Sequence, residues 1–390
     1  MNRNDIAKLF LIAIGMLGLI SETLAQTTTT VTTGLTLPSR VIKGADNSLL
    51  ITESGTSAPN TGRISIVDRT NGTRRTLVSG LPSGVNNLGG SPVPSGPTGL
   101  DLRGISLFVT IGPGDAVTNV GPGLELPTGT ASSPLFDSVL EFFLPWDYAN
   151  LESEFVMKAA DQHRLNTIGW TILKSSYWRF MLVRLVANLP DYRPEPRPNA
   201  PNNVRSSNLY GVEAHGLYLY VADASHNKLH KIPILHGASS TFVEFPNRPN
   251  PLFPNLGGPF IEPVPDGIHR VGDTLLVPML TGFPFVEGFS EIQAVNIKTG
   301  SATTFIGGLT SAIDVTAAPG GSFYALEYSA NQLAGTPGRL KFFETPSSPP
   351  TTVVANLITP SSMVLDHRTG EMYVTEMFTG RLIRVSGLPH

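Results

Sequence analysis

A short apolar strand recurs six times along this chain of 390 residues, and this repeat restricts the fold more than any other feature. Each copy follows a turn that contains Gly or Asp. Short β-rich units that repeat at this period, without regular helices between them, predict a β-propeller. The six copies are LLITES (49–54), LFVTIG (107–112), LYVADA (219–224), LLVPML (275–280), FYALEY (323–328) and MYVTEM (372–377).

We therefore expect an all-β chain that forms one six-bladed propeller. The outermost strand of a blade has five clear copies for six inner strands, because the last unit stops at RLIRVSGLPH (381–390). The missing copy lies at the other end of the chain, in TTVTTGLTLP (29–38). An N-terminal strand that completes the last blade would tie the two ends together and leave no open sheet edge.

The repeat spacing breaks once, in the second unit, which carries about 55 to 60 extra residues. Within them, 145–178 has helical spacing at Leu151, Phe155 and Ala159, with acidic residues in the first turn, and predicts a helical insertion in blade two. Two interpretations stay open: the insert packs a small core against the propeller flank, or it forms an aromatic lid or partner-binding surface. All three tryptophans of the chain lie in it, namely Trp146, Trp170 and Trp178.

The N-terminal segments of the chain predict its cellular location. Residues 1–25 resemble a secretory signal peptide, 26–33 read as a Thr-rich tether, and 34–390 form the propeller. The alternative for the first segment is an uncleaved membrane anchor, but its apolar run is short for a span of roughly 20 residues. After cleavage we expect no membrane span and a secreted or periplasmic location.

Two bulk properties exclude classes of function. The formal net charge of −3 and the absence of a basic stripe argue against a nucleic-acid partner. The chain contains no Cys, which excludes disulfides, thiolate catalysis and Cys-ligated metals.

The clearest polar pattern is an acid at the end of the second strand in four of the six units. These acids accept hydrogen bonds from backbone N–H groups in one interpretation. In the other, they form an acidic rim that attracts cationic or sugar-like ligands. The four residues are Glu53, Asp223, Glu327 and Glu376, and His226 is expected beside Asp223 at the same mouth.

The starts of the inner strands define two rings of aligned residues around the central channel. Four of these residues, Arg40, Tyr210, Asp266 and Asp314, differ from blade to blade, as a site for an asymmetric ligand requires. We expect them on an exposed rim, where a small-molecule or protein ligand would bind. The first ring is Ser39, Thr98, Tyr210, Asp266, Ile313 and Ser361, and the second is Arg40, Gly99, Gly211, Gly267, Asp314 and Ser362.

Five segments together carry a family resemblance: GRISIVDRTNGTRRTLVSGLPSG (62–84), PSGPTGLDLRG (94–104), SNLYGVEAHGLYLYVADASHNKL (207–229), LTGFPF (280–285) and PGRLKFF (337–343). They resemble the ScyD/ScyE family, a group of exported propellers near the NHL and gluconolactonase-like propellers. The resemblance covers nearly all of the mature chain and implies a binding or scaffold protein, accessory to a biosynthetic or envelope process. The family defines no catalytic residues.

Two enzyme hypotheses compete with the binding protein. A lactonase-type propeller would hold a divalent cation such as Ca²⁺ in the channel through about three oxygen ligands, for which Asp266 and Asp314 are candidates, with Asn208 and Glu53 near. A quinone-dependent sugar dehydrogenase would need a catalytic His and basic contacts to its cofactor, for which only His226, Arg40 and Lys228 qualify. Whether the chain is an enzyme stays open at this point.

Overall fold

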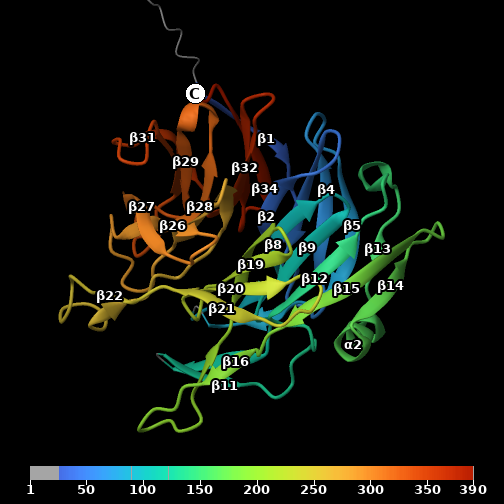
Figure 1. Cartoon of the computed structure of the whole chain (residues 1–390), viewed down its shortest axis with the longest axis horizontal. Helices are drawn as coiled ribbons and strands as arrows, with labels where there is room; N and C mark the ends of the chain where they lie inside the picture. The colour runs from blue at the N-terminus through green and yellow to red at the C-terminus, as the bar shows by residue number, and fades with distance from the viewer. Residues whose placement is uncertain (1–25, 89, 122, 390) are drawn as a thin grey trace, which may run out of the picture.

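The computed structural model describes residues 26–88, 90–121 and 123–389, so the expected signal peptide (1–25) lies outside the described residues. Six antiparallel blades surround a central channel (Figure 1), which confirms the predicted all-β, six-bladed propeller. Each blade contributes one inner strand to the channel. These are β2 (Pro38–Lys43), β8 (Pro97–Arg103), β18 (Leu209–His215), β24 (His269–Val271), β28 (Ala312–Ala317) and β32 (Pro360–Asp366).

The second strand of every blade is apolar and buried, because both of its faces pack between neighbouring blades. It is the strand whose repeat the sequence displays. The second strands are β3 (Ser48–Glu53), β9 (Ser106–Ile111), β19 (Tyr218–Asp223), β25 (Thr274–Met279), β29 (Phe323–Glu327) and β33 (Glu371–Glu376).

The third and fourth strands build the outer part of each blade. The third strands are β4 (Gly62–Asp68), β12 (Ser138–Phe143), β20 (Lys228–Pro233), β26 (Ser290–Asn296), β30 (Gly338–Phe343) and β34 (Arg381–Ser386). The fourth strands are β5 (Arg74–Leu81), β15 (Phe180–Asn188), β21 (Ser240–Glu244), β27 (Ala302–Leu309), β31 (Thr351–Leu357) and, from the N-terminus, β1 (Thr27–Thr32).

The N-terminal strand closes the ring as predicted. Strand β1 pairs antiparallel with β34, with Thr27 opposite Ser386 and Thr32 opposite Leu382. The segment expected to be a tether, 26–33, is therefore largely a strand of blade six. Its backbone also lies tightly against blade one, because a Cβ atom on Gly72, which has a positive φ of 75°, would lie 2.0 Å from the carbonyl oxygen of Val31.

The insert of blade two differs from the prediction in where its helix begins. Helix α2 spans Ala159–Ile168, and Phe155 lies instead in strand β13 (Phe155–Val156), which pairs parallel with β5 of blade one. The Asp161 carboxylate accepts the backbone N–H of Lys158 and fixes the helix start there. Gly169, in the left-handed region, ends the helix before β14 (Trp170–Lys174), which extends the sheet of blade two.

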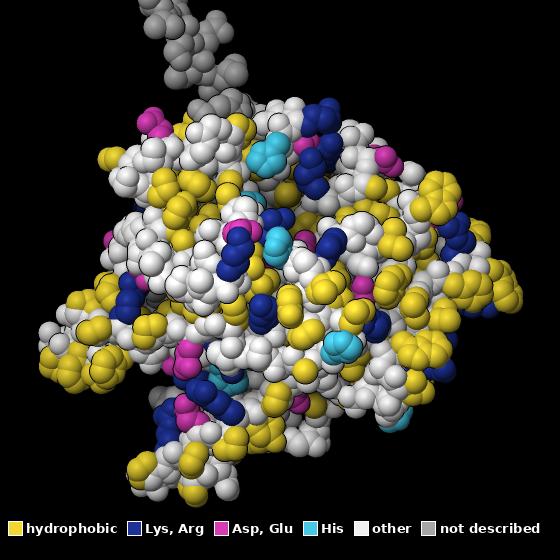
Figure 2. All heavy atoms as spheres, in the orientation of Figure 1, with side chains coloured by type: hydrophobic (Ala, Val, Ile, Leu, Met, Phe, Trp, Pro, Cys, Tyr) yellow, Lys and Arg dark blue, Asp and Glu magenta, His cyan; other side chains and the backbone are white. Residues whose placement is uncertain are grey.

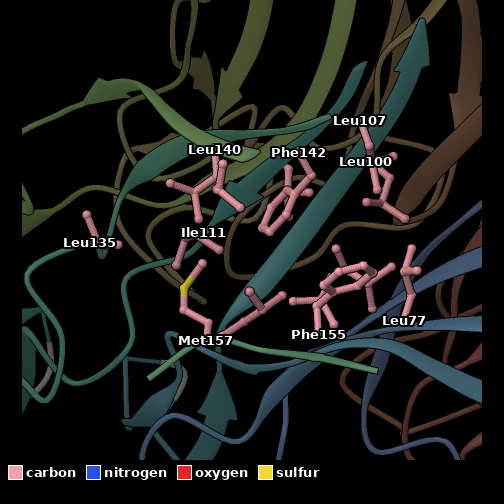
Figure 3. Close-up of a cluster of buried hydrophobic side chains, with 14 of the residues drawn as sticks. Leu77, Leu100, Leu107, Ile111, Leu135, Leu140, Phe142, Phe155 and Met157 are labelled. Carbon is pink, nitrogen blue, oxygen red and sulfur yellow. The ribbon is translucent and has the colours of Figure 1, made fainter. Parts of the chain in front are cut away.

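The insert belongs to the core shared by blades one and two. Phe155 and Met157 are buried beside Leu77 of blade one and Leu140 of blade two (Figure 3). The outward side of the insert is aromatic, with Trp146, Trp170 and Trp178 exposed by 86%, 42% and 72%. The first interpretation of the insert, packing against the flank, therefore describes its inner side.

Four short hairpins extend the loops that lie next to the starts of the inner strands. The hairpins pair β6 (Gly84–Asn86) with β7 (Val93–Ser95), β10 (Val117–Gly121) with β11 (Leu124–Pro127), β16 (Tyr192–Pro194) with β17 (Val204–Ser206), and β22 (Arg248–Pro249) with β23 (Phe260–Ile261).

Within the described residues, no helix is both long and apolar enough to cross a membrane.

Removing β1 tests the ring closure. A mature chain that begins at Thr33 loses the ladder to β34 and exposes the edge of that strand, so we expect its free energy of unfolding to fall by about 3 kcal/mol. Denaturant unfolding of the two chains measures this difference. An unchanged midpoint would show that blade six is stable with three strands and that β1 is dispensable.

Truncating Phe155 tests whether the insert belongs to the core. Phe155→Ala leaves a cavity between blades one and two and should lower the free energy of unfolding by about 3–5 kcal/mol. The neighbouring Val156, 38% exposed, provides the matched control, and Val156→Ala should change stability by less than about 1 kcal/mol. Equal effects of the two substitutions would separate the insert from the core.

Candidate functional site

The four acids at the ends of the second strands are fully buried and hydrogen-bonded. Each accepts a backbone N–H from the residue one or two positions before its own inner strand. Thr310 donates to Glu327 over 2.8 Å, and Ile358 donates to Glu376 over 2.7 Å. Thr36 donates to Glu53 and Asn208 to Asp223 in the same way. These carboxylates therefore fasten the incoming chain to each blade, and they do not form an open acidic rim.

A basic residue on the third strand faces each of these acids across the sheet. Arg339 Nε lies 2.7 Å from Glu327, and Arg381 Nε lies 2.7 Å from Glu376. The sequence carries a signal for these partners, because a basic residue follows Gly or Asn at the start of the third strand in each of these blades. The acid and the basic residue are opposite each other in strand register in all four blades: Glu53 with Arg63, Asp223 with Lys228, Glu327 with Arg339, and Glu376 with Arg381. Among the described residues only the last two form ion pairs, because Glu53 pairs with Arg74 and Asp223 binds histidines instead.

Asp223 differs from the other three acids because it binds two histidines. His226 Nδ1 lies 2.8 Å and His230 Nε2 lies 3.3 Å from the same carboxylate oxygen. Burial would raise the pKa of Asp223, but the hydrogen bonds from these histidines hold that pKa below its usual range. His226 is 7% exposed, so it is a buried partner of Asp223 and does not lie on an open mouth.

The residues expected on an exposed rim are also buried. Asp266 and Asp314 are 4% and 1% exposed, and the Tyr210 hydroxyl is buried without a hydrogen-bond partner among the described residues. Hydroxyl and carbonyl groups fill this end of the channel: Thr98 Oγ1 donates to the Leu209 carbonyl, and Ser361 Oγ to the Pro38 carbonyl. The expectation of an open rim at the inner-strand starts is therefore wrong.

The centre of the channel holds an ion pair between blades one and five. Arg40 Nη1 lies 2.8 Å from Asp314 Oδ2, with the two side chains 13% and 1% exposed. Burial opposes the charge of Arg40, but Asp314 outweighs it and raises the pKa of the guanidinium. Gly99, Gly211 and Gly267 lie at the same level of the channel as Arg40. Because they have no side chains, the guanidinium of Arg40 has room to reach across the channel.

A cavity of about 210 Å³ opens in the other half of the channel, toward the ends of the inner strands. All six inner-strand chains line it, at the position two residues beyond the Arg40 level, because residues i and i+2 of a strand point to the same side. We call these six residues the cavity ring. They are Ile42, Asp101, Glu213, His269, Thr316 and Val364.

The cavity ring contains an interacting pair of acids and a neutral histidine. Burial, followed by the charge of Asp101, raises the pKa of Glu213 to about 7, although Arg270 lies 3.1 Å away. Burial also raises the pKa of Asp101. Burial lowers the pKa of His269 to about 4, and its Nε2 accepts the Ala317 N–H, so Nδ1 carries the ring proton. The ring thus offers acceptors on one side and donors on the other.

The basic residues that line this cavity are Arg40, His269 and His367. Figure 2 shows Lys, Arg and His side chains gathered over the middle of the face, where Figure 1 places β2, β8 and β28. Sequence reasoning missed this end of the channel, although its signal was present two positions further along each aligned inner strand. No group of three or more His, Asp or Glu side chains in the described ranges is arranged to hold a metal ion.

Comparison with known proteins supports the fold and stops short of a family. No protein-family profile matches the chain, and no curated protein matches it. A gluconolactonase from Xanthomonas campestris has a similar structure, with a TM-score of 0.51 and 10% identity, over 94% of this chain and 93% of that one. This similarity supports the six-bladed propeller fold.

Two further solved structures are similar at lower scores. A protein of unknown function from Bacteroides thetaiotaomicron has a TM-score of 0.49 and 10% identity, over 93% of this chain and 76% of that one. A virginiamycin B lyase from Staphylococcus aureus has a TM-score of 0.43 and 11% identity, over 92% of this chain and 98% of that one. Identities this low carry no information about substrate or chemistry.

Neutralising Asp266 and neutralising Asp314 should have opposite effects on the stability of the protein. Burial and then the charge of Asp314 raise the pKa of Asp266 well above its usual range. The folded state therefore keeps the Asp266 proton above about pH 4, where the unfolded chain loses it, and stability falls as pH rises from there. Asp266→Asn removes this loss, so the variant should gain stability over the parent chain as pH rises.

Asp314→Asn is the matched comparison, because it leaves Arg40 buried without its partner. We expect this variant to lose about 3–5 kcal/mol at pH 7. Urea unfolding of both variants between pH 4 and pH 8 measures the difference. A loss of similar size in Asp266→Asn would mean that Asp266 is ionised and paired in the folded protein.

Proposed function

We propose that this chain is an exported propeller of the ScyD/ScyE type, secreted or periplasmic, that binds a small-molecule or protein ligand without transforming it. The ion pair between Arg40 and Asp314 carries this proposal. It places a permanent positive charge in the channel at the level where a lactonase-type enzyme would need a divalent cation. A guanidinium 2.8 Å from the best candidate ligand repels a metal and removes one carboxylate from its coordination.

The cavity beyond this ion pair is the ligand site that we propose. Arg40, paired with Asp314, lies at its floor, and the aliphatic side chains of Ile42 and Val364 form part of its wall. The volume of about 210 Å³ lies below the roughly 300 Å³ typical of drug-sized sites, so a small-molecule ligand would be correspondingly small. A role as an accessory to a biosynthetic or envelope process fits such a binding protein.

A metal-dependent hydrolase or lactonase is the alternative, and metal binding separates the two. The purified mature protein, dialysed against buffer with Ca²⁺ or Zn²⁺, should retain less than about 0.1 metal ion per chain by elemental analysis. Stoichiometric calcium or zinc, together with hydrolysis of an aldonolactone, would replace the binding protein by the enzyme.

The variant Arg40→Ala should bind the metal ion that the parent chain does not bind. Without the guanidinium, the Asp314 carboxylate has no counter-charge, so calcium should bind in place of Arg40, raise the melting temperature of this variant and leave that of the parent unchanged. The double variant Arg40→Ala/Asp314→Asn is the control and should not respond. An equal calcium response of parent and Arg40→Ala would show that Arg40 does not occupy a cation position.

A further inference from the structure

Acidic and basic residues lie at different depths along the cavity. Asp101 and Glu213 belong to the cavity ring, and the basic residues lie further out along the inner strands, toward solvent. We call the outer group the basic rim. It consists of Lys43, Arg103, Arg270 and Arg368, from blades one, two, four and six.

The basic rim is only partly neutralised. Asp366, fully buried, binds Lys43 over 2.6 Å and also pairs with Arg69. Arg103 donates to the uncharged Gly216 carbonyl. Among the ion pairs of the described ranges, none includes Arg103 or Arg368.

Excess positive charge is also evident at Lys43. Burial, followed by the charges of Arg69 and Arg368, lowers the pKa of the Lys43 ammonium. The net charge of the whole chain is −3, so these basic residues are not part of a general excess of positive charge. It favours an anionic group at the opening of the cavity.

The deeper level favours the opposite charge. The Asp101 carboxylate accepts the Ala214 N–H over 2.7 Å and has no ion pair among the described residues. Glu213 has one partner, Arg270, and Arg40 on the floor is already neutralised by Asp314. A cation placed between Asp101 and Glu213 would relieve the repulsion between these two carboxylates.

We propose that this mouth binds a small zwitterion, of the class of neutral amino acids, with its ammonium group between Asp101 and Glu213 and its carboxylate toward the basic rim. This inference rests on the proposed function, because it specifies the ligand of the same cavity. Ile42 and Val364, the two aliphatic members of the cavity ring, would contact an apolar side chain. The His269 Nδ1–H and Thr316 hydroxyl are further hydrogen-bonding groups of the cavity ring.

Isothermal titration with three related probes tests the charge arrangement. L-Leucine carries both charges, leucinamide keeps only the ammonium, and N-acetyl-leucine keeps only the carboxylate. We expect L-leucine to bind at least tenfold more tightly than either analogue. Equal binding of either analogue, or no binding of L-leucine, would overturn the zwitterion.

Two variants assign each charge to its end of the site. Asp101→Asn should weaken L-leucine and leucinamide at least fivefold and leave N-acetyl-leucine unchanged. Arg103→Gln/Arg368→Gln should weaken L-leucine and N-acetyl-leucine at least fivefold and leave leucinamide unchanged. Arg164→Gln/Arg193→Gln, at exposed positions outside the channel, is the matched control and should change none of the three affinities. The same loss for all three probes in either channel variant would contradict the assignment.

The pH dependence gives an independent measurement. Glu213 faces Asp101 of β8, Arg40 of β2 and Arg270 of β24, with His269 and His367 on the same cavity wall. Below pH 7 Glu213 gains a proton and no longer attracts the ammonium, so L-leucine should bind more weakly at pH 6 than at pH 8. Titration in buffers of different ionisation enthalpy should show proton release on binding near pH 7, and Glu213→Gln should abolish it. Proton uptake would reverse the sign and reject the model of the site.

A cavity-filling variant separates this inference from the proposed function. Ile42→Trp occupies the cavity from β2, and circular dichroism checks that its fold is unchanged. If an analogue binds as well as L-leucine and Ile42→Trp prevents it, the channel is a ligand site and only the zwitterion is wrong. If Ile42→Trp leaves L-leucine binding unchanged, the cavity is not the site and both proposals for it fail.

Discussion

The buried ion pair between Arg40 and Asp314 holds the propeller together at its axis. Asp314 Oδ2 also accepts the Ser362 hydroxyl over 3.0 Å and the Met363 N–H over 2.8 Å, so one carboxylate joins blades one, five and six. Ser362 and Met363 are buried and Arg40 is largely so, and each charge would be costly without the other. The pairing of β1 with β34 connects two of these blades, one and six, at their outer edge. The ring is therefore closed twice, at the axis by charge and at the rim by a backbone ladder.

Glycine determines where the channel is closed. A Cβ atom on Gly99 would lie 2.3 Å from the Tyr210 carbonyl oxygen, and one on Gly211 would lie 2.4 Å from the Asp266 carbonyl oxygen. Inner strands of neighbouring blades can approach this closely only where a side chain is missing. These contacts and the arginine–aspartate pair fill one level of the channel. The cavity ring is the next level along the strands, where each blade again carries a side chain.

The sequence predicted the blades well because their signal is local. The apolar second strand and the acid at its end recur in one chain segment, and the surplus outer strand at the N-terminus follows from the same comparison. Burial of the aligned rings could not be predicted this way, because Arg40 and Asp314 lie 274 residues apart and meet only when the ring closes. The start of α2 was predicted too early because Phe155 fits a helical spacing equally well, and its pairing with β5 is a tertiary contact.

The two ends of the channel use their charged residues differently. At the strand starts, an acid that accepts a backbone N–H of the incoming chain recurs in four blades, which is what a structural role requires, because each blade needs the same connection. At the strand ends, the six residues of the cavity ring include two aliphatic residues, two acids, a histidine and a threonine. A packing role would favour similar residues at equivalent positions. Differences between equivalent positions suit a partner that is itself asymmetric, and this contrast is why we propose the ligand site at the strand ends.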